Sequence, residues 1–291
     1  MKQSFEVLRH GEKDETGHIS EDGREKIRDR AKELFEEIKT YPEGTVIAFM
    51  PSNIERTQKT RDIFEETLIS LFNEAGQGYR ILDVHDIGEI QKIDSSTKEK
   101  VLIKGLSYSS LIGIPKTGDP RGAKLFEKSR QIFGNEGFAV KTWAAWSPEE
   151  LAQLRQEMLK ENPEAPVAEF DTTFFGSPEQ VTIKQIRWLM SMMEINQGHF
   201  PNNEIKLFGI SHNANTDFLV MKLLGMPINA AGLDEIGGAR NYLEGHKIDI
   251  ENGRVKISYR DQEREFDEED LKKIIEELEK ETEERKKRWS V

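Results

Sequence analysis

The sequence predicts an α/β fold, a three-layer αβα sandwich around a mostly parallel sheet. Two observations predict it. Short apolar segments rich in strand-forming residues alternate along the chain with longer segments of helical periodicity. Clusters of polar residues also follow directly after several of the apolar segments, where open α/β sheets place their functional sites. Strands that alternate with helices are typical of a parallel sheet with helices on both faces.

The first half of the chain supplies strands and helices in alternation. The expected strands occupy residues 4–8, 45–50 and 80–84. Between them, one helix follows the capping residue Ser20 and ends near residues 41–44, and a second helix spans residues 56–72. Residues 45–50 are almost entirely apolar, which indicates a parallel strand that is buried on both faces.

This alternation is lost between residues 95 and 176, where turn-rich segments and one expected helix, 148–160, take its place. We interpret 95–176 as a helical and loop insertion that covers the site, within a single domain of residues 1–291. The alternation then resumes with a helix at 178–195, a strand at 205–210 and a helix at 217–224.

The C-terminal part predicts a hairpin and a long helix. Asn252-Gly253 lies between two alternating segments, 247–250 and 255–259, which is a strong hairpin signal. Residues 267–291 predict a charged helix, whose apolar stripe we expect to pack on the body of the protein while its charged face meets solvent.

Composition restricts the class of protein. A chain of 291 residues, 36% of them hydrophobic, can bury one substantial core. Its net charge of −12 argues against broad binding of nucleic acid or anionic membranes. The absence of cysteine excludes disulfides, thiolate chemistry and sulfur-bound zinc. The N-terminus is charged and no segment reaches the roughly 18 apolar residues that span a bilayer, so we expect a cytoplasmic protein.

Polar clusters follow three strands that we expect to end at one edge of the sheet. Arg9 and His10 follow the first strand, Ser52 and Arg56 the second, and His212 the strand at 205–210. Because parallel strands end at the same edge, these side chains can converge. Arginine and histidine supply fixed donors for a dianionic phosphate, which the planar fork of arginine suits better than the point charge of lysine. The clusters therefore predict a phosphate site.

The same motifs resemble those of a known family. Leu8-Arg9-His10-Gly11-Glu12 is similar to the signature of the histidine phosphatase superfamily, which includes the cofactor-dependent phosphoglycerate mutases. Residues 19–25, 52–60 and 209–212 resemble the turn and helix that follow this signature, the second signature, and the segment that bears the second histidine. The resemblance spans residues 5–225, and the region from about 95 to 176 is not matched.

The resemblance implies a phosphomonoester hydrolase that needs neither metal nor cofactor. Neutral His10 would attack phosphorus to form a phosphohistidine, which water then cleaves. Arg9, Arg56 and His212 would hold the phosphate oxygens, together with the backbone amide of Asn213, where relatives often have glycine. The implied substrate is a small-molecule phosphate ester or a phosphoprotein.

The leaving oxygen needs a proton donor. Glu89 follows the third expected strand, as the acid of the family does. A carboxyl group near arginines tends to stay ionised, so Glu89 would need partial burial to act as an acid at neutral pH. Asp14, Asp86 and Asp217 are alternatives for this role.

Three other functions remain open. The mutase branch typically has Glu-Ser and Trp-Asn shortly after its arginine-histidine-glycine, whereas residues 12–16 of this chain read Glu-Lys-Asp-Glu-Thr, which favours hydrolysis over mutase-like transfer. An inactive relative that binds a phosphorylated ligand is disfavoured by the presence of both arginines and both histidines. His85-Asp86 could belong to an HD-type metal phosphohydrolase, but the expected strands argue against that all-helical fold.

Overall fold

The computed structural model describes residues 2–85, 93, 97–106, 178–199, 204–228, 230–238 and 240–289. The chain divides into two compact units. The first comprises residues 1–113, 188–212 and 240–268, and the second comprises 114–187, 213–239 and 269–291. Arg9, His10, Arg56 and His212 all belong to the first unit, which is therefore the unit that carries the candidate site.

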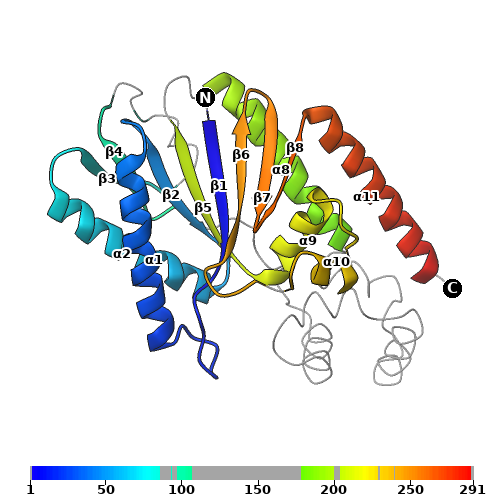
Figure 1. Cartoon of the computed structure of the whole chain (residues 1–291), viewed down its shortest axis with the longest axis horizontal. Coiled ribbons are helices and arrows are strands. Elements are labelled where there is room, and N and C mark those ends of the chain that lie inside the picture. Colours follow the sequence, from blue (N-terminus) through cyan, green and yellow to red (C-terminus); the bar gives the residue numbers. More distant parts are fainter. Residues whose placement is uncertain are drawn as a thin grey trace. The chain divides into compact units, whose positions relative to one another are not determined.

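An eight-stranded sheet forms the centre of the first unit (Figure 1). Its strands are β1 (Lys2–Arg9), β2 (Val46–Pro51), β3 (Tyr79–Asp83), β4 (Lys100–Lys104), β5 (Ile205–Ser211), β6 (Gly245–Glu251), β7 (Arg254–Tyr259) and β8 (Gln262–Phe266). They lie in the order β3-β4-β2-β5-β1-β6-β7-β8. The first five in this order are mutually parallel, and the last three are added antiparallel. The predicted α/β class with a mostly parallel sheet is confirmed.

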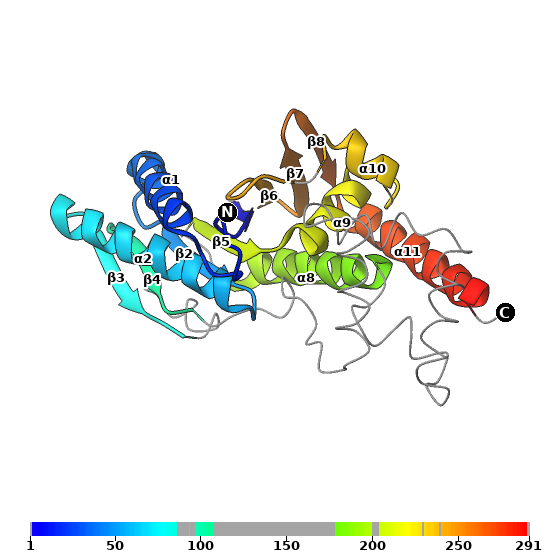
Figure 2. The same ribbon diagram turned by 90° about the horizontal axis from the view of Figure 1, so that it is seen from below.

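Helices cover both faces of this sheet. Helices α1 (Glu21–Thr40) and α2 (Glu55–Ala75) lie side by side in two perpendicular views (Figures 1 and 2), and their apolar residues form one buried cluster with strand residues such as Leu8. Successive side chains of a strand point to opposite faces of the sheet, so Phe5, three residues before Leu8, points to the face opposite Leu8. There its ring contacts Trp188 of α8 (Pro178–His199), 5.0 Å between centroids. The predicted three layers are present.

Helix α1 begins where the sequence predicts because Ser20 caps it. The Ser20 hydroxyl oxygen accepts a hydrogen bond from the Gly23 backbone N–H at 3.0 Å, and Glu21 and Asp22 place negative charge at the positive end of the helix. Gly23 is also required for close packing, since a Cβ there would lie 2.3 Å from the Glu12 carbonyl oxygen. This contact fixes the loop that follows the first predicted polar cluster.

Strand β4 corrects the predicted boundary of the insertion. It lies inside residues 95–176, yet it is an inner strand of the sheet, and its residues Val101, Leu102 and Ile103 are fully buried. The sequence did not reveal it because only three apolar residues stand between two lysines. Residues 107–177, including the predicted helix at 148–160, lie outside the described residues, so the remainder of the insertion and the single-domain boundaries stay predictions.

The C-terminal hairpin forms as predicted between β6 and β7. Asn252 and Gly253 both have positive φ, 52° and 73°, as a type I′ turn requires. Strand β8 then extends the sheet, although its sequence Gln-Glu-Arg-Glu-Phe carries little strand signal.

The second unit contains α9 (Asn213–Leu223), α10 (Ala230–Glu235) and α11 (Glu268–Trp289), of which α11 begins one residue before the unit does. The predicted C-terminal helix is present, and Leu271, Ile275 and Leu278 of its apolar stripe are buried. Within the part of the chain that the structure describes, no helix is both long and apolar enough to cross a membrane.

Candidate active site

The candidate site lies at the carboxyl ends of three adjacent parallel strands. Arg9 is the last residue of β1 and His10 follows it, while Ser52 follows β2 and His212 follows β5. The strand ends are level with one another, because Arg9 pairs with Ser211 and Pro51 pairs with Ile210. The three polar clusters that the sequence marked are therefore brought to one edge of the sheet.

Arg56 bridges the two histidines from the first turn of α2. Its Nε–H donates to Nε2 of His10 at 3.0 Å, and its Nη2–H donates to Nδ1 of His212 at 3.0 Å. The two imidazole rings lie edge to face, 5.0 Å apart between centroids. One guanidinium thus holds both rings at a fixed separation.

The backbone of Gly11 sets the tautomer of His10. Nδ1 of His10 lies 2.7 Å from the Gly11 carbonyl oxygen, which can only accept, so Nδ1 carries the proton. Nε2 consequently presents a lone pair, which the Arg56 N–H occupies. Burial, followed by the charge of Arg56, lowers the pKa of His10 to about 3, so the ring is neutral near neutral pH. A buried, neutral imidazole with a directed lone pair is a competent nucleophile.

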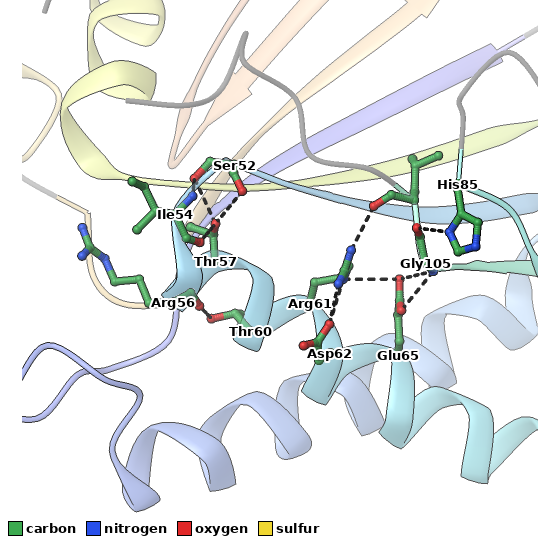
Figure 3. Close-up of polar contacts among 11 residues, drawn as sticks. Ser52, Ile54, Arg56, Thr57, Thr60, Arg61, Asp62, Glu65, His85 and Gly105 are labelled. Carbon is green, nitrogen blue, oxygen red and sulfur yellow. Dashed lines mark hydrogen bonds and ion pairs between the residues drawn. The ribbon is translucent and has the colours of Figure 1, made fainter. Parts of the chain in front are cut away.

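Threonines of the segment 52–60 lock the first turn of α2 onto the loop after β1, and Figure 3 shows the contacts of Thr57 with Ser52 and of Thr60 with Arg56. The hydroxyl of Thr60 donates to the Arg56 carbonyl at 2.8 Å and accepts from the Gly11 N–H at 3.1 Å. Thr57 lies beside Ser52, 2.9 Å between their hydroxyl oxygens. These contacts tie the segment that bears Arg56 to the segment that bears His10.

Arg9 is held by a segment that the sequence did not mark. Its Nη1–H donates to the carbonyl oxygen of Arg240, and its guanidinium lies 4.0 Å from the ring centroid of Tyr242. The Tyr242 ring is also 5.8 Å from the His10 ring. Arg240 and Tyr242 precede β6, the antiparallel neighbour of β1, so only knowledge of that strand pairing could have identified them.

The site concentrates positive charge. Arg9 and Arg56 are close enough that the charge of Arg9, after burial, lowers the pKa of Arg56. Burial and the charge of Arg56 also lower the pKa of His212 well below its usual value, which keeps that ring neutral near neutral pH. Two guanidinium groups beside two neutral imidazoles are suited to a doubly charged oxyanion.

Other predicted residues are not placed in this cluster. Glu89 and Asp86 lie outside the described residues. Asn213 is the first residue of α9, and its side chain is also outside the described part. Asp14 is exposed and accepts hydrogen bonds from Thr16 and His18, which lower its pKa and make it a poor proton donor.

His85 and a buried carboxylate, Glu65, occupy a separate polar cluster at the ends of β3 and β4 (Figure 3). Nδ1 of exposed His85 lies 3.0 Å from the Gly105 carbonyl oxygen, and both carboxylate oxygens of Glu65 lie 3.3 Å from the Gly105 N–H. Arg61 lies 4.0 Å from Glu65. Among the described residues, no three His, Asp or Glu side chains are grouped closely enough to bind a metal ion.

Glu65→Gln is expected to change how stability depends on pH. Burial raises the pKa of Glu65 to about 7, against 4.5 for an ordinary glutamate. The folded state therefore retains a proton that the unfolded state releases, and stability falls as pH rises between these two values. Glutamine keeps an acceptor for Gly105 but cannot ionise. We expect a gain in unfolding free energy of up to about 3 kcal/mol at about pH 8, and none at about pH 4.

Denaturant unfolding of both proteins across this pH range measures the difference. Ser70→Ala, a change at an exposed hydroxyl on the same helix, serves as the control. Parallel curves of stability against pH for Glu65→Gln and the parent would show that Glu65 does not titrate in this range.

Comparisons with known proteins return only solved structures of low similarity. No model of a known protein family matches the sequence, and no curated protein matches it. Among solved structures, a mycobacterial glucosyl-3-phosphoglycerate phosphatase is 12% identical with a TM-score of 0.39, over 84% of this chain and 89% of that chain. A protein described as mycobacterial hydrolase 2 is 14% identical with a TM-score of 0.42, over 95% and 98%. A phosphoglycerate mutase from Plasmodium falciparum is 10% identical with a TM-score of 0.34, over 89% and 91%.

Proposed function

We propose that this chain is a phosphomonoester hydrolase of the histidine phosphatase type, which acts through a phosphohistidine on His10. The observation that carries the proposal is the state of His10. Its tautomer is set by the Gly11 carbonyl, its ring is neutral, and its Nε2 lone pair points at Arg56 in a site that also holds His212. The motifs of residues 8–12 and 52–60, which resemble the family signatures, supply His10, Gly11 and Arg56, and the segment 209–212 supplies His212.

In the proposed first step, a phosphate ester binds between Arg9, Arg56 and His212. The Arg56 N–H groups move from the imidazole nitrogens to phosphate oxygens, which frees the lone pair on Nε2 of His10. Nε2 then bonds to phosphorus as the bond from phosphorus to the leaving oxygen breaks. Arginine N–H groups balance the charge on the equatorial oxygens, and the Gly11 carbonyl stabilises the positive phosphoimidazole through its bond to Nδ1–H.

In the proposed second step, water attacks phosphorus in line and His10 departs as a neutral imidazole. We assign Glu89 as the group that protonates the leaving oxygen and later accepts the proton of the water. The assignment rests on its position in the sequence after β3. The proposed substrate is a small-molecule phosphate ester or a phosphoprotein. Hydrolysis is proposed over mutase activity because residues 12–16 differ from the mutase pattern.

Hydrolysis of p-nitrophenyl phosphate in excess EDTA tests this function. We expect the rate to stay within about twofold of the rate without chelator, because the arginines and histidines bind the phosphate without a metal. Inorganic phosphate should appear in equal amount to p-nitrophenol. A rate that collapses in EDTA and returns with added divalent metal would support the rival that uses His85 and Asp86.

A further inference from the structure

His212 lies between two partners that together determine where its proton sits. Arg56 can only donate, so Nδ1 of His212 must accept the hydrogen bond from Nη2, at 3.0 Å. In a neutral ring the proton is then on Nε2. Nε2 lies 3.3 Å from the hydroxyl oxygen of Ser52, which accepts it. The lone pair of His212 therefore faces the site, and its proton faces away from it.

The hydroxyl of Ser52 is held in the orientation that accepts this proton. The Thr57 hydroxyl is 2.6 Å from the Ile54 carbonyl oxygen, so its own proton is committed to a carbonyl. The Ser52 hydroxyl consequently donates to Thr57, at 2.9 Å, and its lone pairs are left for His212 and for the Ile54 N–H. Ser52 and Thr57 are fully buried, so no solvent competes for these bonds. Each group in this chain therefore donates its hydrogen bond to the next: His212 to Ser52, Ser52 to Thr57, and Thr57 to the Ile54 carbonyl oxygen.

With its proton held on Nε2, His212 presents only a lone pair, on Nδ1, to an oxyanion that binds in the site. Once the Arg56 N–H groups turn to the anion, the lone pair on Nδ1 of His212 faces an anion oxygen, and two lone pairs in contact repel. A proton on Nδ1 turns this contact into a charge-assisted hydrogen bond. Nε2 cannot supply that proton internally, because it remains bonded to Ser52. The proton must come from solvent.

We propose that Ser52 is a positioning residue that holds the proton of His212 on Nε2, so that binding of a dianionic oxyanion takes up one proton at Nδ1. The proposal rests on the proposed function, because it requires that this site binds phosphate. In the proton balance, one solvent proton joins Nδ1, the Nε2 proton stays on His212, and no other covalent bond forms or breaks. His212 is then an imidazolium that donates to the anion on one side and to Ser52 on the other.

The groups around His212 define the direction of the pH effect. Burial, followed by the charge of Arg56 of α2, lowers the pKa of His212 in the free site, and His10, Arg9 and Lys13 of β1 and the following loop act in the same direction. A bound dianion opposes the positive charges of Arg9, Arg56 and Lys13 and raises the pKa of His212. At pH values between the pKa of His212 in the free site and its pKa in the anion-bound site, the anion binds better to protein with protonated His212. The affinity is therefore higher at lower pH. It falls about tenfold per pH unit when one proton is taken up.

Calorimetry with sulfate tests this proposal, since sulfate stays a dianion throughout the range and does not itself titrate. Binding is measured between about pH 6 and pH 8, in two buffers with different heats of ionisation, which count the protons taken up. We expect about one proton for the unaltered protein. Binding with no proton uptake would overturn the proposal. Failure to bind sulfate at all would contradict the anion site itself, and the proposed function with it.

Ser52→Ala tests the role of the serine. Without an acceptor at Nε2, neutral His212 can carry its proton on Nδ1 and donate it to the anion directly. Proton uptake should then fall toward zero and the affinity should lose its pH dependence. An unchanged pH slope would overturn the role of Ser52. Thr57→Val, which removes the acceptor that orients Ser52, should reduce the uptake in the same direction and serves if Ser52→Ala does not fold.

Two further variants test whether the proton uptake depends specifically on Ser52 and His212. Thr67→Val removes a hydroxyl that donates to the Ile63 carbonyl on the same helix, and should leave the proton uptake unchanged. His10→Ala should also keep it, because the proton is assigned to His212. Loss of the uptake in His10→Ala would place the proton on His10 and overturn the proposal.

Discussion

His10→Ala is expected to lower the turnover of p-nitrophenyl phosphate by at least about a thousandfold, equivalent to about 4 kcal/mol of lost transition-state stabilisation. The reason is that the variant lacks the atom proposed to bond to phosphorus, and the alanine side chain has no nucleophilic atom to replace it. Arg9, Arg56 and His212 remain, so phosphate should still bind. A large loss of kcat with little loss of phosphate inhibition is therefore the expected signature.

A second measurement examines the intermediate itself. Rapid mixing with a labelled phosphate ester, followed by quenching in base, should trap label on the parent protein and none on His10→Ala, because phosphohistidine survives base and is lost in acid. His85→Ala is the matched control, since it removes an exposed histidine from the other polar cluster. Full activity in His10→Ala would contradict the proposed function. Loss of activity in His85→Ala would favour the metal-dependent rival.

The sequence revealed those strands whose apolar segment is long enough to stand out. Every residue of β2 and β5 is buried, and both segments are mostly apolar, with Lys206 the one charged residue of β5. Strand β4 has only three apolar residues, and β8 buries only Phe266. Both form because a neighbouring strand supplies hydrogen-bond partners, which is long-range information that a local pattern does not contain.

The residues of the candidate site likewise fall into those that the local sequence pattern predicted and those that depend on long-range contacts. His10, Arg56 and His212 follow or lie close to strand ends, and parallel geometry alone brings strand ends together. Tyr242 was missed because its position depends on the antiparallel pairing of β6 with β1. The tautomers of the two histidines were also beyond reach. They depend on the Gly11 carbonyl oxygen, 2.7 Å from Nδ1 of His10, and on the Ser52 hydroxyl oxygen, 3.3 Å from Nε2 of His212. Residue type alone does not predict such contacts.

Arg56→Ala is expected to lower kcat/KM by about a hundredfold to a thousandfold, the range typical for loss of one donor that stabilises a developing oxyanion. The loss should affect binding and turnover together, because Arg56 contacts both histidines in the free site and is proposed to contact phosphate oxygens in the reaction. Arg56→Lys keeps the charge but not the fork that reaches two nitrogens at once. We expect it to recover only part of the activity.

The same pair of variants separates the charge of Arg56 from its geometry. The Arg56 charge is, after burial, a cause of the lowered pKa of His10, which is about 3. Because protonated His10 cannot attack, activity is lost as pH falls through this pKa. Arg56→Ala removes the charge and should move the acidic limb of the kcat/KM profile to higher pH, whereas Arg56→Lys should leave it near that of the parent. Arg28→Ala, on the exposed face of α1, should change neither the rate nor the profile. Identical acidic limbs in Arg56→Ala and the parent would show that the neutral state of His10 is set by burial alone.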